Sequence, residues 1–210
     1  IFTNALKDYE IVYNFNKNYL NFLNKKEDDK NFFYEGNLKF KPFTANLRFK
    51  YNSIDLIDLL KNDSILYELV RSNVFFNENL NYKINLTSKK IKNYKKLNSL
   101  DLKVNFDQGI LNFNDTYLFF GETLKFKVVE GIYINNLNEE NFYGEILIEI
   151  LDDKKLYSFL QTNKKYRKNI KNISVEFRYD YKNNELFFEK ILIKGKYSNE
   201  VSNLIKQFNS

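Results

Sequence analysis

Adjacent carboxylates are the side chains of this sequence that come nearest to a catalytic set. Asp28-Asp29, Glu139-Glu140 and Asp152-Asp153 each place two acids side by side. A glycosidase needs two carboxyl groups roughly 5–10 Å apart across a sugar, and neighbours in sequence seldom aim at one substrate atom. All three pairs lie in polar loops or at a helix start. We therefore expect solvated charges, with Asp152 or Asp153 serving as the N-cap of a helix.

The residue types that carry most enzyme chemistry do not occur in the chain. It has no His and no Cys, so an imidazole-assisted nucleophile and the common zinc sites cannot be built. No glycine-rich phosphate loop of the Walker type occurs either. We expect no catalytic residue, no metal and no cofactor, and we expect that the protein is not an enzyme.

A basic cluster occupies residues 164–171, in a chain whose net charge is +6. Its side chains Lys164, Lys165, Arg167 and Lys168 are candidates for binding phosphates, on anionic lipid headgroups or on nucleic acid. The other interpretation is a solvated helix end whose cations favour the C-terminal dipole. Nucleic-acid modules display aromatic residues on an exposed, basic sheet. The strand aromatics of this chain alternate in phase with Ile, Leu and Val, so we expect no nucleic-acid partner.

An alternation of apolar and polar residues with period two dominates the chain. Leu102, Val104 and Phe106 alternate with polar residues, and similar runs recur in 47–51, 82–86, 146–150 and 175–179. A strand places successive side chains on opposite faces, so each run has one apolar and one more polar face. This predicts a mostly β fold with a few helices. We expect a strongly twisted, largely antiparallel sheet that forms an open groove or half-barrel, with helices at its ends or edges.

Three short turns and three helices are predicted between these runs. Residues 107–109, 130–131 and 182–184 contain Gly or Asn and are typical of hairpin connections. Apolar residues at helical spacing predict helices over 53–71, 152–162 and 198–208. In the last helix the expected apolar stripe is Val201, Leu204, Ile205 and Phe208. Residues 25–30 and 88–98 are expected to be a mixed-charge loop and a basic loop.

The apolar face has two interpretations. It is either the closed core of a sandwich or barrel, or a groove open to a long apolar ligand such as an acyl chain. The candidate groove residues share the apolar phase of the predicted strands: Leu102, Val104, Phe106, Leu111, Phe113, Phe126, Val128, Ile146, Ile148, Ile150, Val175 and Phe177.

Several segments resemble the AsmA-like family of Gram-negative bacteria, which includes the TamB and YhdP types. Residues 34–43 resemble the family's strand of type Gly-x-Leu-x-Phe-x-Pro-Phe, and a helix start of type Ile-Asp-Leu follows at residues 54–56. Residues 102–131 resemble its meander of short strands. Residues 156–168 are similar to its short helix with a basic cluster, which leads into the paired strands that end at residues 191–195. The resemblance covers most of residues 32–195.

This resemblance implies a lipid-conducting β groove that faces the periplasm. It implies phospholipid acyl chains as the ligand, transport between the inner and outer membranes, a role in outer-membrane homeostasis, and an anchor in the cytoplasmic membrane outside these residues. The first residues are Ile1-Phe2-Thr3, and we expect residues 1–210 to be a single segment of a longer protein, possessing no membrane-spanning run of its own.

The main alternative function is a structural module in outer-membrane protein assembly. There the sheet would be a closed sandwich, and its exposed edges would pair with strands of envelope proteins. A nucleic-acid-binding domain and an enzyme rank below it.

Overall fold

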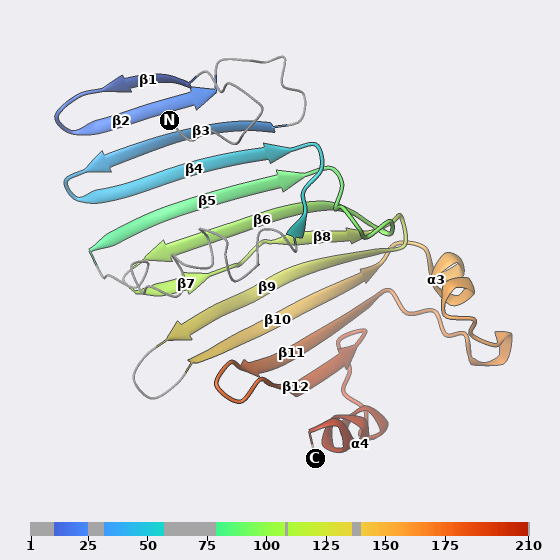
Figure 1. Ribbon diagram of the computed structural model, residues 1–210. Helices are drawn as coiled ribbons and strands as arrows, with labels where there is room; N and C mark the ends of the chain where they lie inside the picture. The colour runs from blue at the N-terminus through green and yellow to red at the C-terminus, as the bar shows by residue number, and fades with distance from the viewer. Residues whose placement is uncertain (1–10, 25–31, 57–78, 108, 136–139, 210) are drawn as a thin grey trace.

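One open sheet organises the computed structural model, which describes residues 11–24, 32–56, 79–107, 109–135 and 140–209 (Figure 1). Its twelve strands are β1 Ile11–Phe15, β2 Tyr19–Asn24, β3 Phe32–Phe40, β4 Phe43–Tyr51, β5 Leu80–Ser88, β6 Leu97–Asp107, β7 Ile110–Asn112, β8 Tyr117–Phe120, β9 Leu124–Asn135, β10 Glu140–Ile150, β11 Asn172–Asp180 and β12 Glu185–Ile193.

The strands lie in nearly sequential order from β1 to β12, and these two end strands do not pair with each other. β7 and β8 share one place in the sheet, because both lie between β6 and β9. β4 and β5 are parallel, and every other pair of strands in the described residues is antiparallel. The prediction of a twisted, largely antiparallel sheet that stays open is confirmed.

Short turns with polar side chains connect the hairpins. In the turn between β11 and β12, Asp180 Oδ1 accepts hydrogen bonds from the backbone of Lys182 and Asn183, at 2.9 and 3.1 Å. Asn184 completes this turn with a φ of 56°. Gly109, with a φ of 81°, lies between β6 and β7. Both regions were predicted as turns, and both predictions are confirmed.

The predicted turn at Glu130-Gly131 is wrong. β9 runs without interruption from Leu124 to Asn135. What breaks the alternation of apolar residues is a β-bulge, at which Val128 pairs with Ile146 and Glu130 pairs with Glu145. An extra residue in one strand shifts its period by one, which in the sequence looks like the end of a strand.

Two α-helices are described, α3 (Asp153–Phe159) and α4 (Asn199–Phe208). Asp152 is the N-cap of α3, and its Oδ1 accepts from Lys155 N at 2.9 Å, as predicted. Ser198 caps α4. The prediction that Leu204 belongs to the apolar stripe of α4 is wrong, because this side chain is 63% exposed. Residues 57–71 of the remaining predicted helix, and the mixed-charge loop 25–30, lie outside the described residues.

Helix α4 lies against the last strand of the sheet. Ile205 is buried, and the ring of Phe208 lies 4.7 Å from that of Phe188, between centroids. Beyond the helix, the side-chain amide of Asn209 bonds to both backbone groups of Phe188. Asn209 Oδ1 accepts from Phe188 N at 3.1 Å, and Asn209 Nδ2 donates to Phe188 O at 2.8 Å.

The core lies in the middle of the sheet. One cluster contains Ala45, Tyr82, Phe106, Leu111 and Tyr133, from strands β4 to β9. Tyr82 and Phe106 stack with their ring centroids 4.8 Å apart. A second cluster contains Ile54, Leu86, Ile91 and Leu100. Ile91 belongs to the basic loop between β5 and β6, and it pairs with Ile54 in an isolated parallel bridge.

Candidate functional site

A continuous apolar face extends across the sheet, because the register aligns the apolar residues of neighbouring strands. Residues directly opposite one another in a ladder share a face. One row crosses β4, β5 and β6 through Leu47, Ile84 and Val104. Another crosses from β9 to β12 through Phe126, Ile148, Ile173 and Ile193. We call the surface formed by these and the parallel rows the apolar face.

Two β-bulges keep the face continuous. Before Val129, the even-numbered residues of β9 lie on the apolar face, and after it Gly131 and Tyr133 do. In β12 the extra residue is Glu189, which lies between Phe188 and Ile191. Without an extra residue, the second half of each strand would present its apolar side chains to the opposite face.

Glycines on the apolar face leave room for phenyl rings. A Cβ built on Gly144 would lie 2.7 Å from Cε1 of Phe177, its cross-strand partner. Gly36 of β3 likewise leaves room for the ring of Phe22. The rings of Phe142 and Phe177 lie 5.8 Å apart between centroids. The face is therefore a packed aromatic and aliphatic surface at these points.

The predicted groove residues all lie in the sheet or beside it, but they differ in burial. Phe106 has 0% exposed surface, so it cannot contact a ligand, and its place among the groove candidates is corrected to the core. Leu111 and Ile150 are buried as well. The other nine residues keep partial exposure: Leu102, Val104, Phe113, Phe126, Val128, Ile146, Ile148, Val175 and Phe177.

The other face of the same strands carries charged and polar side chains. Lys190 Nζ lies 2.7 Å from Glu176 Oε1, and this hydrogen bond raises the pKa of the lysine above its usual value. Lys125 lies 3.5 Å from Glu149. Ser174 Oγ donates to Glu145 Oε1 at 2.6 Å. This second face is therefore polar and partly ion-paired, and ion pairs this exposed to solvent contribute little to stability.

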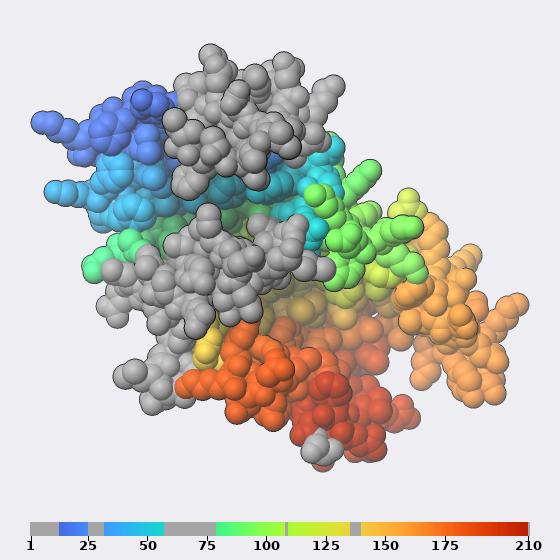
Figure 2. All heavy atoms as spheres, viewed as in Figure 1, coloured from blue at the N-terminus to red at the C-terminus, as the bar shows by residue number. Residues whose placement is uncertain are grey.

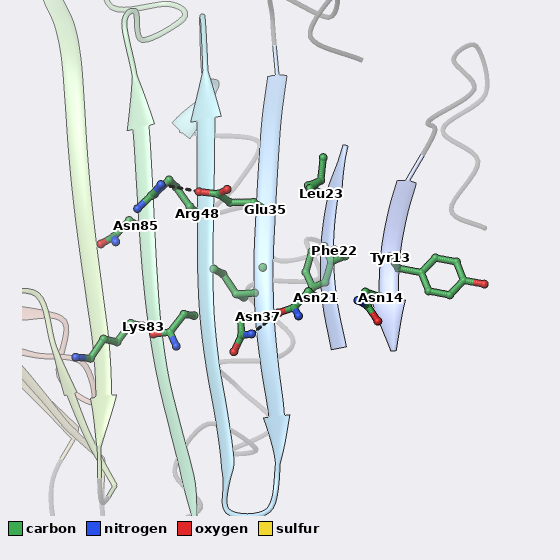
Figure 3. A pocket seen from close by; sticks show the side chains of 13 residues that line it. Tyr13, Asn14, Asn21, Phe22, Leu23, Glu35, Asn37, Arg48, Lys83 and Asn85 are labelled. Carbon is green, nitrogen blue, oxygen red and sulfur yellow. Dashed lines mark hydrogen bonds and ion pairs between the residues drawn. The ribbon is translucent and has the colours of Figure 1, made fainter. Parts of the chain in front are cut away.

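A shallow hollow of about 520 Å³ lies over β1 to β5 (Figure 3). Asn21, Asn37, Asn46 and Lys83 form a row of polar side chains in it, and Asn37 Nδ2 donates to Asn21 Oδ1. The one carboxylate among its lining residues is Glu35, which is paired with Arg48 at 2.6 Å. A single, paired carboxylate does not provide the two acids that hydrolysis of a glycoside requires.

The remaining carboxylate pairs form no site in the part of the chain that the structure describes. Asp152 caps α3, and Glu140 Oε1 accepts from Tyr133 Oη at 2.7 Å. Asp28, Asp29 and Glu139 lie outside the described residues. Among those described, no three His, Cys, Asp or Glu residues lie close enough together to hold a metal ion.

The basic cluster lies beyond helix α3, at the ends of the strands. Lys164 and Lys165 belong to the short 3-10 helix η2 (Lys164–Tyr166), and α3 has no cation in its last turn. The alternative interpretation is therefore wrong in placing these cations at the C-terminal dipole of the 152–162 helix, although they are solvated as it expected. Tyr157 of α3 holds the segment, because its hydroxyl accepts from Lys168 N at 3.0 Å. Lys164, Lys165, Arg167 and Lys168 are all exposed.

The contribution of β2 to β5 to the apolar face was missed in the sequence. Their alternation was visible, but the candidate set contained only residues of β6 and later strands. Pairing of Leu47 with Ile84, and of Ile84 with Val104, places these earlier strands on the same face. The parallel pairing of β4 with β5 joins strands β1–β4 to the rest of the sheet. No local sequence pattern predicts this pairing.

No protein-family model matches the chain, and no curated protein or solved structure matches it. The resemblance to the AsmA-like family therefore stays a prediction. Within the residues described, no helix has the length and apolar character needed to cross a membrane.

Proposed function

We propose that this chain is a non-catalytic, lipid-binding β groove that conducts phospholipid acyl chains. It would act as one segment of an AsmA-like protein, anchored in the cytoplasmic membrane and facing the periplasm, in phospholipid transport between the two membranes and in outer-membrane homeostasis. The observation that supports this proposal is the apolar face: it is continuous across an open sheet, and nine of its predicted residues keep exposed surface.

The dimensions of the sheet suit an acyl chain. Strands β6 and β10 have 11 residues each, which corresponds to roughly 36 Å at about 3.3 Å per residue. Eleven strand positions at about 4.8 Å give a width of roughly 50 Å before twist. Each methylene removed from water contributes about 0.8 kcal/mol. A surface of repeated Ile, Val and Phe has similar affinity at successive positions, which favours movement of the bound chain along it.

A substitution in the middle of the apolar face tests the proposal. Ile148 lies between Phe126 and Ile173, and aspartate there would place a charge against any bound acyl chain. We expect Ile148→Asp to lower the phospholipid that copurifies with the chain by at least about tenfold. The measurement is native mass spectrometry with lipid extraction, on chain purified from bacterial cells.

Leu147→Asp is the matched control, because it introduces the same charge one residue away on the opposite face. Leu147 pairs with Lys127 and Ser174, so the new carboxylate would lie beside a cation. The control should keep wild-type lipid. A lipid-free wild-type chain, or an Ile148→Asp chain that is unfolded by circular dichroism while Leu147→Asp folds, would contradict the open groove and favour a closed assembly module.

An assembly role by strand pairing remains the second candidate. Among the described residues β1 pairs on one side, with β2, and its Tyr13 and Phe15 are largely exposed. An exposed strand edge is a template for a partner strand. This candidate predicts that the chain captures an extended peptide at β1 and carries no lipid.

A further inference from the structure

One end of the sheet gathers loops that are far apart in the sequence. The loop 89–96, the turn 121–123, the segment 151–171 and the turn 194–196 all lie there, at the right in Figure 1. Backbone hydrogen bonds connect them: Gly121 N donates to Lys96 O at 2.7 Å, and Leu151 N donates to Thr123 O at 2.8 Å. We call the surface formed by residues 89–96, 151–171 and 194–196 the basic rim.

Exposed cations concentrate on the basic rim: Lys89, Lys90, Lys92, Lys95, Lys96, Lys154, Lys155, Lys164, Lys165, Arg167, Lys168, Lys171, Lys194 and Lys196. The described carboxylates beside them include Asp55, Glu122, Asp152 and Asp153, far fewer than the cations. Glu122 and Asp152 both neighbour Lys155, and the 2.5 Å contact with that lysine holds the pKa of Glu122 below its usual range. The opposite end of the sheet carries fewer exposed lysines, which include Lys17, Lys39, Lys41 and Lys182. Among the described residues, positive charge is therefore concentrated at one end of the strands.

Exposed apolar side chains lie among these cations. Leu160 is 58% exposed and Tyr166 is 63% exposed, both in the segment that follows α3. Leu151, Phe159 and Tyr94 are also exposed. Large apolar side chains among lysines are typical of surfaces that enter the boundary between headgroups and acyl chains.

The two basic segments are in contact with each other. Lys96 of the loop 89–96 places its ammonium 3.6 Å from the ring centroid of Phe159 in α3, and Phe159 packs on Phe120 at 5.3 Å. A hollow of about 350 Å³ adjoins this contact, lined by Tyr94, Lys95, Lys96, Leu97 and Phe120. Figure 2 shows the corresponding green and orange segments projecting on the same side of the molecule.

We propose that the basic rim docks this chain on the surface of an anionic phospholipid bilayer. Its lysines lie at the headgroup phosphates, and Leu160 and Tyr166 enter the interface beside them. The exposed aromatic side chains of the rim suit both a bilayer and nucleic-acid bases, but Leu151 and Leu160 favour a bilayer, because aliphatic side chains enter the acyl boundary and have no π-face for stacking. The inference goes beyond the proposed function, since docking needs no lipid on the apolar face.

The test is flotation of the full chain with vesicles of phosphatidylcholine, with and without about 30% phosphatidylglycerol, a composition chosen to give an anionic surface. We expect binding to the anionic vesicles alone. Neutralising Lys164, Lys165, Arg167 and Lys168 to Gln together should weaken it by about fivefold for each cation removed. The matched control neutralises Lys17, Lys39, Lys41 and Lys182, which are exposed at the opposite end of the sheet and change the net charge equally.

A second variant separates insertion from charge. Leu160→Asn keeps every cation and should weaken binding at least about fivefold, most visibly at high salt, where the electrostatic attraction is screened. Ile148→Asp should float like the wild type, so failure of docking and failure of the groove give different results. Equal losses in the rim and control variants, or no binding to anionic vesicles, would overturn the proposal. The proposal would also be overturned if the chain bound a 30-nucleotide single-stranded DNA more tightly than the anionic vesicles, with an affinity for DNA that Leu160→Asn leaves unchanged.

Discussion

The glycines of the apolar face act through the space that they leave. Gly144 gives room to the ring of Phe177, which a Cβ would meet at 2.7 Å. Its φ is not positive, so backbone conformation does not require glycine there. The packing of the Phe177 ring therefore explains why glycine occupies position 144. This explanation can be tested by substituting Gly144 or Phe177.

Gly144→Ala should lower the free energy of unfolding by about 1–3 kcal/mol, because the ring must leave its place. Phe177→Leu removes the clash, so the double variant should be more stable than the sum of the single effects predicts. Urea unfolding of the four chains measures this coupling. Strictly additive effects would show that the ring is not what Gly144 accommodates.

Sequence alternation predicted which side chains share a face, but not which of them are buried. Phe106 and Ile148 occupy equivalent phases in similar strands, yet Phe106 is fully buried and Ile148 keeps exposed surface. The difference depends on what lies opposite each residue, such as Tyr82 stacked on Phe106. The alternation of residues within one strand does not show which side chains of other strands will cover it.

At the scale of elements, local signals were read correctly where the interaction is local. Asp152 caps α3 as predicted, and α4 ends at the predicted Phe208, both through contacts within one or two turns. The turn at 180–184 depends on Asp180 and on the positive φ of Asn184. The bulge at Val129 was misread as a turn, because a bulge is defined by the partner strand.

Deleting Val129 tests the function of that bulge. Without the extra residue one half of β9 must present its apolar residues to the charged face, and Tyr133 or Phe126 leaves its neighbours. We expect a loss of more than about 3 kcal/mol in the free energy of unfolding, typical of losing a large buried side chain. Deletion of Asn169, exposed in the segment after η2, is the control and should be nearly neutral. A wild-type melting temperature for the Val129 deletion would contradict this account.

At the scale of the molecule, each strand packs mainly on its sheet neighbours. The buried clusters lie between β4 and β9, whereas no residue described in β1, β2 or β3 is buried, and β1 pairs on one side alone. The overall architecture was predictable from repeated alternation, since many amphipathic strands with short turns form antiparallel sheets. The strand order was not, because the parallel β4–β5 pair and the shared place of β7 and β8 depend on long-range contacts.

Hydrogen exchange should therefore follow position in the sheet. We expect the slowest amide exchange in β5, β6 and β9, and the fastest in β1. β12 is also an end strand, but α4 and Asn209 cover it, so its hydrogen-bonded amides should exchange more slowly than those of β1. Mass-spectrometric exchange on peptic fragments measures the gradient, and equal protection in β1, β6 and β12 would contradict it.

The amide of Asn209 has a consequence for assembly into fibres. Linear polymers of β proteins grow when the last strand of one molecule templates the first strand of the next. Asn209 already fills the hydrogen-bonding rung at Phe188, so an incoming chain must first displace it there. Every head-to-tail junction needs a β12 edge, so this one contact hinders addition of a molecule at either end of a growing polymer.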